Sequence, residues 1–146
     1  MKTFLAGLVL LLVSCGAPET LRVRQFHLRD TQPASGDLFI RAEMNKRLHG
    51  AVTKEERALR MGDYYHVRWH GLGGRKPVKI LFEYRQARTG ARILRYEAIA
   101  PASSEGDRQI RIWGEDFRDN GRVSAWRVSL YEGSEVVAQK QSFLWD

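Results

Sequence analysis

The stretch that decides the fold is residues 64–85, which read YYHVRWHGLGGRKPVKILFEYR. Apolar and polar side chains alternate along its first part and again along its last part, with glycines and a proline between them. Because successive side chains of a β-strand point to opposite faces, a period of two predicts two half-buried strands here. The side chains expected on the buried faces are Tyr65, Val67, Trp69, Val78, Ile80, Phe82 and Tyr84.

Further strands are predicted on both sides of this stretch. They cover residues 21–26, 38–43, 94–98, 126–130 and 136–145, and one more begins at Ile110. Turn-forming sequences rich in Gly, Asp, Asn, Ser and Pro separate them at 33–37, 71–74, 87–90, 101–107, 119–121 and 132–134. Short strands with turn signals about every ten residues predict an all-β, antiparallel sandwich of about seven to eight strands.

One short helix is predicted near residues 54–61. Thr53 and Glu56 have the spacing of a capping box, in which each side chain satisfies a free backbone N–H of the other. Gly62 is expected to end the helix, and two turns need packing against the body to persist. The strand count and the closing hairpin resemble immunoglobulin-like and fibronectin-type sandwiches. The intersheet cysteine pair of true immunoglobulin domains is missing, so the resemblance implies an architecture only.

The first 14 residues, MKTFLAGLVLLLVS, have the features of a secretory signal peptide: one cation, a ten-residue apolar run and a small residue at the end. A helix of ten residues spans roughly 15 Å, which is half of the hydrocarbon core, so the run is too short for an ordinary membrane span.

Cys15 directly follows this leader and is the only cysteine of the chain. Leu12-Val13-Ser14-Cys15 resembles the lipobox of bacterial lipoproteins. The resemblance implies that the thiol of Cys15 receives a diacylglyceryl group, that the leader is cut before it, and that the new amino terminus is acylated, for example with palmitate. The alternative is an ordinary secreted protein whose cysteine lies near its cleavage site by chance.

The resemblance also implies a location in the bacterial cell envelope. Two or three acyl chains hold a protein stably on a membrane. Gly16 stands where an aspartate would imply retention at the inner membrane, so the outer membrane, facing the periplasm, is favoured. We expect a lipidated tether over residues 15–20 and a single domain over residues 21–146.

The chain is basic, with a formal net charge of +7 that falls to +6 when Lys2 is removed with the leader. Such a balance is consistent with an anionic lipid or an anionic polymer as partner, and equally with an arginine-rich genome. The cations are scattered along every segment, which favours the second interpretation. An exported lipoprotein is not expected to bind nucleic acid.

No catalytic, metal or cofactor site is predicted. His66 and His70 would lie about 13 Å apart on one strand face, and His27 and His49 have no ligand-like spacing. Residues 116–121 are acidic but lack the ligand pattern of a calcium loop, and residues 71–76 precede a strand rather than the helix that a phosphate loop needs. The latter are interpreted as a flexible hairpin.

Three interpretations of function follow. The first is a lipid-anchored, non-enzymatic binding or assembly module near the membrane. The second is a hydrolase of an envelope polymer, with the histidines and a carboxylate pair, Glu83 and Glu97, as acids and bases; cross-strand ion pairs with Lys79, Arg85 or Arg95 are the more ordinary role of these glutamates. The third is a peripheral binder of anionic lipids or polyanions. The four tryptophans, Trp69, Trp113, Trp126 and Trp145, are expected mostly in the core rather than on a sugar-binding face.

Overall fold

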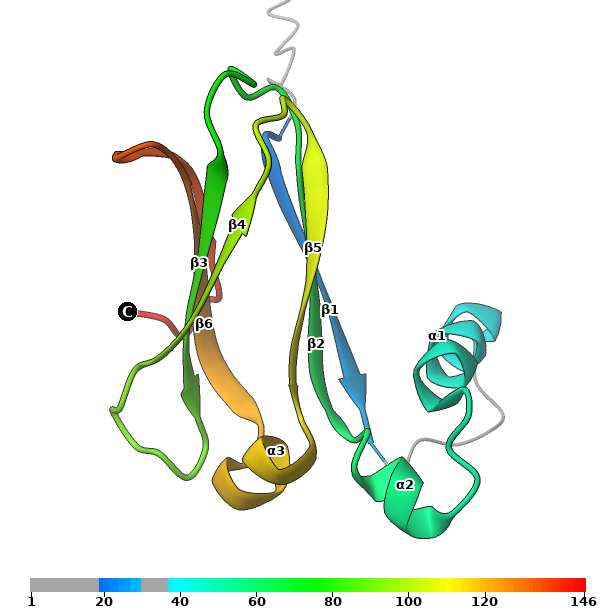
Figure 1. Cartoon of the computed structure of the whole chain (residues 1–146). Coiled ribbons are helices and arrows are strands. Elements are labelled where there is room, and N and C mark those ends of the chain that lie inside the picture. Colours follow the sequence, from blue (N-terminus) through cyan, green and yellow to red (C-terminus); the bar gives the residue numbers. More distant parts are fainter. Residues whose placement is uncertain (1–18, 30–36) are drawn as a thin grey trace, which may run out of the picture.

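The computed structural model describes residues 19–29 and 37–146. Within this part of the chain, seven strands form two antiparallel sheets that pack face to face (Figure 1). One sheet has the order β1-β2-β5, and the other has the order β4-β3-β6-β7. The strands are β1 Leu21–Leu28, β2 Gly62–Trp69, β3 Val78–Gln86, β4 Leu94–Ala100, β5 Gly106–Trp113, β6 Val123–Glu132 and β7 Glu135–Gln141. The predicted all-β sandwich is confirmed.

The core lies between the two sheets and contains the alternating side chains that the sequence predicts. Tyr65 and Val67 on β2 and Ile80 and Phe82 on β3 are at most 1% exposed. The ring of Tyr65 lies 4.8 Å from that of Phe82. Since burying one such side chain contributes about 1.5–3 kcal/mol, these two strands supply a large part of the driving force for folding.

The connection from β2 to β3 crosses from one sheet to the other, so residues 71–76 are not the predicted hairpin. The backbone N–H groups of Gly73 and Gly74 donate to the carboxylate of Glu132, at 3.3 and 3.2 Å. The amides of this loop are therefore engaged by the chain itself. The next strand, β4, pairs with β3, whereas the fourth strand of a constant-type immunoglobulin domain belongs to the opposite sheet.

The strand predicted over residues 38–43 is wrong, because this segment begins the helix α1, Leu38–Leu48. The side chain of Asp37 accepts a hydrogen bond from the backbone N–H of Phe39 and caps the helix. Arg47 forms an ion pair with Glu43 one turn earlier. Capping and this i,i+4 pair outweigh the strand preference of the apolar residues at the start of the segment.

Two shorter helices lie at one end of the sandwich (Figure 1). α2, Lys54–Ala58, has the predicted capping box between Thr53 and Glu56, with both hydrogen bonds present. α3, Gly114–Asn120, was not predicted; the sequence indicated only the turn at residues 119–121. Gly121 ends this helix with a φ of 81°, which glycine adopts without strain.

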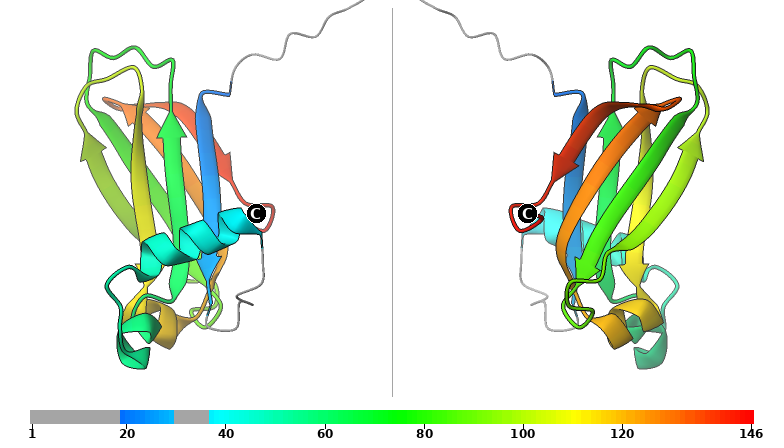
Figure 2. Two further views of the ribbon diagram at one scale, coloured as in Figure 1. Left: turned by 90° about the vertical axis from the view of Figure 1, so that its right-hand side faces the viewer. Right: turned by 90° about the vertical axis from the view of Figure 1, so that its left-hand side faces the viewer.

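β1 begins at the opposite end of the sandwich from α2 and α3 (Figures 1 and 2). Glu19 forms ion pairs with Lys140 and Arg22, and the carbonyl of Thr20 accepts a hydrogen bond from the N–H of His70. The predicted signal peptide 1–14, the lipobox with Cys15 and the turn at 33–36 lie outside the described residues. No helix in the described part is long and apolar enough to cross a membrane.

Candidate functional site

The outer face of the three-stranded sheet, β1-β2-β5, carries a row of cations. Strand pairing places Arg22 opposite Arg68 and Arg24 opposite His66. All of these side chains point away from the core, because their neighbours Leu21, Val23 and Val67 point into it. Arg22 and Arg68 are like charges placed directly opposite each other, and Asp107 on β5 lies opposite Arg68 on its other side.

The helix α1 crosses the lower part of this face (Figure 2). None of its residues is buried. The guanidinium of Arg47 lies 4.4 Å from the ring centroid of Phe26 and 4.7 Å from that of Tyr64. Arg60 donates to the carbonyl oxygens of Arg47 and His49, at 2.9 and 2.6 Å. The helix is thus held on the sheet mainly by two arginines and not by an apolar interface.

Burial lowers the pKa of the Arg47 guanidinium, and repulsion from Arg111 acts in the same direction, while Tyr64 opposes both. An arginine nevertheless remains charged at neutral pH. Glu43 neutralises this charge, and the contacts of Arg47 with Phe26 and Tyr64 hold the helix on the sheet.

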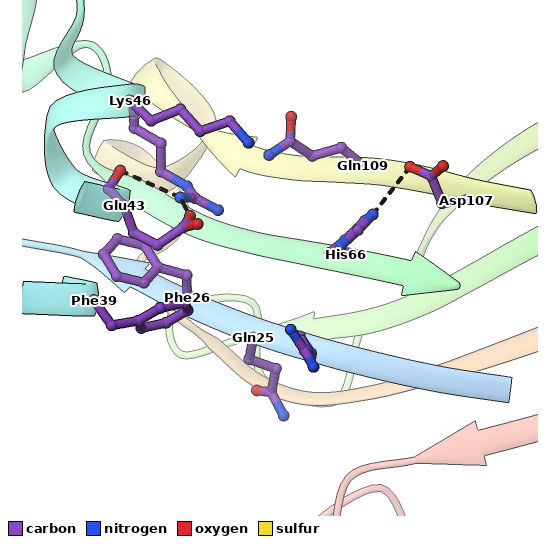
Figure 3. Close-up of a pocket in the computed structure, with 10 residues that line it drawn as sticks. Gln25, Phe26, Phe39, Glu43, Lys46, His66, Asp107 and Gln109 are labelled. Atoms are coloured by element: carbon purple, nitrogen blue, oxygen red, sulfur yellow. Dashed lines mark hydrogen bonds and ion pairs between the residues drawn. The ribbon is translucent and has the colours of Figure 1, made fainter. Parts of the chain in front are cut away.

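A groove of about 220 Å³ lies between α1 and the sheet (Figure 3). Its walls combine cationic, acidic, amide and aromatic side chains from α1, β1, β2 and β5. These are Arg24, Gln25, Phe26, Phe39, Glu43, Lys46, Arg47, His66, Asp107 and Gln109. A second, much smaller hollow, lined by Arg22, Arg24, His66 and Arg68, continues it along the strands.

Each of the two carboxylates of the groove has a partner within the protein. Glu43 pairs with Arg47, and the Oδ2 of Asp107 lies 3.0 Å from the Nε2 of His66. Among the described residues, no carboxylate lies within ion-pair distance of Arg24, Lys46 or Arg68. Within the described part of the chain, the groove therefore presents Arg24 and Lys46 without a carboxylate partner, beside one carboxylate that an arginine neutralises and one that is hydrogen-bonded to His66. These two cations are suited to contact an anion.

The carboxylate pair predicted for a hydrolase is not formed as two directly facing residues. Register places Glu83 opposite Arg95 and Glu97 opposite Leu81. Glu83 accepts hydrogen bonds from Arg127 and Arg95, at 2.5 and 3.2 Å, which confirms the predicted ion pair with Arg95. Burial would raise the pKa of Glu83, but the two arginines outweigh burial and hold that pKa below its ordinary value. Neither glutamate lines the groove.

The histidines are spread over the molecule. His66 lines the groove, His27 contacts Asp63, and His70 follows the end of β2. In the described ranges, no group of three or more His, Cys, Asp or Glu side chains could hold a metal ion. Within residues 116–121, the amide of Asn120 donates to Asp116 and Arg118 donates to Asp119, so these acids have partners on the same helix.

Three of the four tryptophans are buried, as expected, but not in one place. Trp69 and Trp126 belong to the core between the sheets. Trp145 is 5% exposed and lies under the guanidinium groups of Arg85 and Arg127, outside that core. Trp113 is 38% exposed. The tryptophans do not form an exposed cluster on the described surface.

The sequence does not indicate the groove and its cationic strip, because Arg24, Lys46 and Arg68 come from three separate segments, β1, α1 and β2. The alternation along residues 21–26 and 64–69 places Arg22, Arg24 and Arg68 on outward faces, but it does not say which strands are neighbours. Comparisons of the chain with protein-family models, with curated proteins and with solved structures give no match.

Proposed function

We propose that this chain is a lipid-anchored lipoprotein of the bacterial cell envelope, whose body is a non-enzymatic binding module that presents the groove beside the membrane. The observation that carries the anchor is the single cysteine at the end of an apolar leader, in the sequence Leu12-Val13-Ser14-Cys15. A thioether-linked diacylglycerol and an acylated amino terminus together give stable membrane attachment. Gly16 favours the outer membrane.

The distance from Cys15 to the body supports a position close to the bilayer. Glu19 and Thr20 already contact the sandwich, through Lys140 and His70. Four residue steps separate Cys15 from Glu19 and span at most about 14 Å. A body on so short a tether stays near the lipid surface.

The charge of the amino-terminal end supports the same position. The loop between β2 and β3 lies at this end and contains the exposed cations Arg75 and Lys76. Each cation near an anionic leaflet contributes about 1 kcal/mol to binding. These two residues would add an electrostatic contact to the lipid anchor.

The test is detergent phase partitioning of the expressed chain, followed by mass spectrometry of its amino terminus. The wild-type protein is expected in the detergent phase, with its first residue Cys15 carrying fatty acyl groups. Cys15→Ser is expected to remain uncleaved or to leave that phase, whereas Gly16→Ala serves as a control that keeps the cysteine. An unmodified sulfhydryl on a mature wild-type chain would reject the proposal.

A further inference from the structure

We propose that the groove under α1 and the cationic strip that continues it bind an extended anionic polymer, such as an acidic glycan of the envelope. This inference deepens the proposed function by naming the ligand class of the same site. It concerns Arg24 on β1 and Lys46 on α1, which both line the groove, and Arg22 and Arg68, which continue the strip.

The shape of the site favours an extended ligand over a single small anion. Arg22 and Arg24 are two residues apart on β1, so their side chains leave the sheet about 7 Å from each other. Lys46 reaches the groove from α1, with its ammonium group toward Gln109 on β5 (Figure 3). Arg22 and Arg24 follow one another along β1, and Lys46 lies across the strands from them. Successive anionic groups of one chain can therefore contact these cations in turn.

The composition of the walls favours a ligand with both charged and neutral polar groups. Gln109 supplies an amide donor and acceptor beside Lys46 (Figure 3). Phe39, which is 59% exposed, provides an apolar wall at the helix side. A polymer of acidic sugars has anionic groups for the cations, hydroxyl groups for the amides and ring carbons for the aromatic surface.

The position of the site favours a polymer over the headgroup of a bilayer lipid. Arg24 lies three residues beyond the start of β1, about 10 Å along the strand, and α1 crosses the sheet still further from the amino-terminal end. If Cys15 anchors the chain, that end faces the bilayer. A headgroup in the membrane plane would then reach Arg22 and Arg68 but not Lys46.

The experiment uses the full mature protein, purified in a non-ionic detergent, with fluorescently labelled dextran sulfate as the probe and uncharged dextran as its control. We expect dextran sulfate to bind and uncharged dextran not to bind. The variant Arg24→Gln with Lys46→Gln should bind dextran sulfate at least about tenfold more weakly. Its plot of log affinity against log salt should be shallower by about two, since counterion release scales with the number of cations in contact.

The matched control is Arg92→Gln with Lys54→Gln, which removes the same charges from exposed positions outside the groove. Equal weakening in this control would mean that net charge alone attracts the polymer, and would overturn the site. Arg68→Gln is the second test variant. It removes one cation of the strip, so binding should weaken. Thermal unfolding checks that this variant is folded, since Arg68 lies opposite both Arg22 and Asp107. Undiminished binding by both groove variants would also reject the inference.

A competition experiment distinguishes an anionic polymer from an anionic lipid as the ligand. Micelles containing phosphatidylglycerol should displace dextran sulfate no better than neutral micelles do. Strong displacement that depends on Arg24 and Lys46 would identify a lipid headgroup as the ligand and overturn the proposal. Phase partitioning tests the anchor without any polymer, so an anchored protein that binds no polymer contradicts this inference alone.

Discussion

Asp63 has no exposed side-chain surface, and three donors surround it. It accepts hydrogen bonds from His27 at 2.7 Å, from Arg29 at 2.5 Å and from the backbone N–H of Val123 at 2.7 Å. These bonds join β1, β2 and β6, and therefore both sheets. Burial alone would raise the pKa of Asp63, but the three donors outweigh it and hold the pKa below its ordinary value.

Asp63→Asn should therefore destabilise the fold at neutral pH by about 2–4 kcal/mol, because the buried donors lose their charged acceptor. A carboxylate with a lowered pKa stabilises the fold above its unfolded pKa of about 3.9 and loses this effect as the pH falls through its folded value. The difference in unfolding free energy between the wild type and the variant should therefore become smaller below about pH 4. Chemical denaturation over a pH series measures the unfolding free energy of each protein, with the exposed Asp107→Asn as control. A difference that stays constant from neutral to acidic pH would contradict a stabilising role of the Asp63 carboxylate.

Gly106 on β5 leaves room for the indole ring of Trp69 on β2. It lies opposite Trp69, and a Cβ at this position would be 2.4 Å from the indole ring. Gly106→Ala should lower stability by about 1–3 kcal/mol, since a packed ring has to move. Thermal unfolding tests this prediction against Gly73→Ala, where the added Cβ meets only the flexible end of Glu132. Equal melting temperatures for the two variants would show that the ring of Trp69 can move at little cost in stability, and would contradict this prediction.

At the scale of elements, the position of α1 on the sheet depends on few side chains. Arg47 and Arg60 hold its last turn in place. In its first turn, the side chains of Leu38 and Phe39 are 75% and 59% exposed. A helix with no buried residue gains little from burial of apolar area. The wall of the groove is therefore the least stable part of the site.

Arg47→Ala should release α1 from the sheet, because it removes the contacts to Phe26 and Tyr64 together with the pair to Glu43. Cation–π contacts contribute about 0.5–2 kcal/mol each. The amide protons of residues 38–48 should then exchange faster with solvent, while those of β2 and β3 keep their protection. Arg41→Ala, an exposed change on the same helix, is the control. Unchanged exchange in the Arg47 variant would mean that α1 is held by other contacts.

The capping box of α2 is a second local test. Thr53→Ala removes the acceptor of the Glu56 N–H and should cost about 1 kcal/mol, whereas Thr53→Ser keeps the hydroxyl and should cost little. Urea denaturation of the two variants compares them directly. An equal loss in both would assign the effect to the methyl group of Thr53 instead.

At the scale of the whole molecule, the two ends of the sandwich are expected at different distances from the membrane. An eight-residue strand such as β1 is about 27 Å long. Once Cys15 is acylated, an introduced cysteine is the only free thiol, since the chain has one cysteine. A fluorophore on Arg75→Cys should therefore transfer energy to an acceptor at the lipid surface much more efficiently than one on Arg118→Cys. Equal transfer from the two positions would contradict the proposed orientation.

The strands were predicted well because their signal is local. Burial of every second side chain leaves a period of two, and residues 64–69 and 78–84 carry it clearly. α1 was predicted wrongly because its decisive features, the cap at Asp37 and the pair of Arg47 with Glu43, compete with an apolar start that favours a strand. The groove was not predicted, because its cations approach one another only through the pairing of β1 with β2 and the placement of α1.

The sequence by itself determined the alternating faces, the capping box and the composition of the leader, since each depends on residues close together in the chain. Tertiary structure alone decided that β2 and β3 belong to different sheets, that Arg22 faces Arg68, and that α1 covers the lower part of that face. Strand register and helix docking set these contacts. They arise from the burial of apolar side chains between the two sheets and from Arg47 on Phe26 and Tyr64, interactions between residues far apart in sequence.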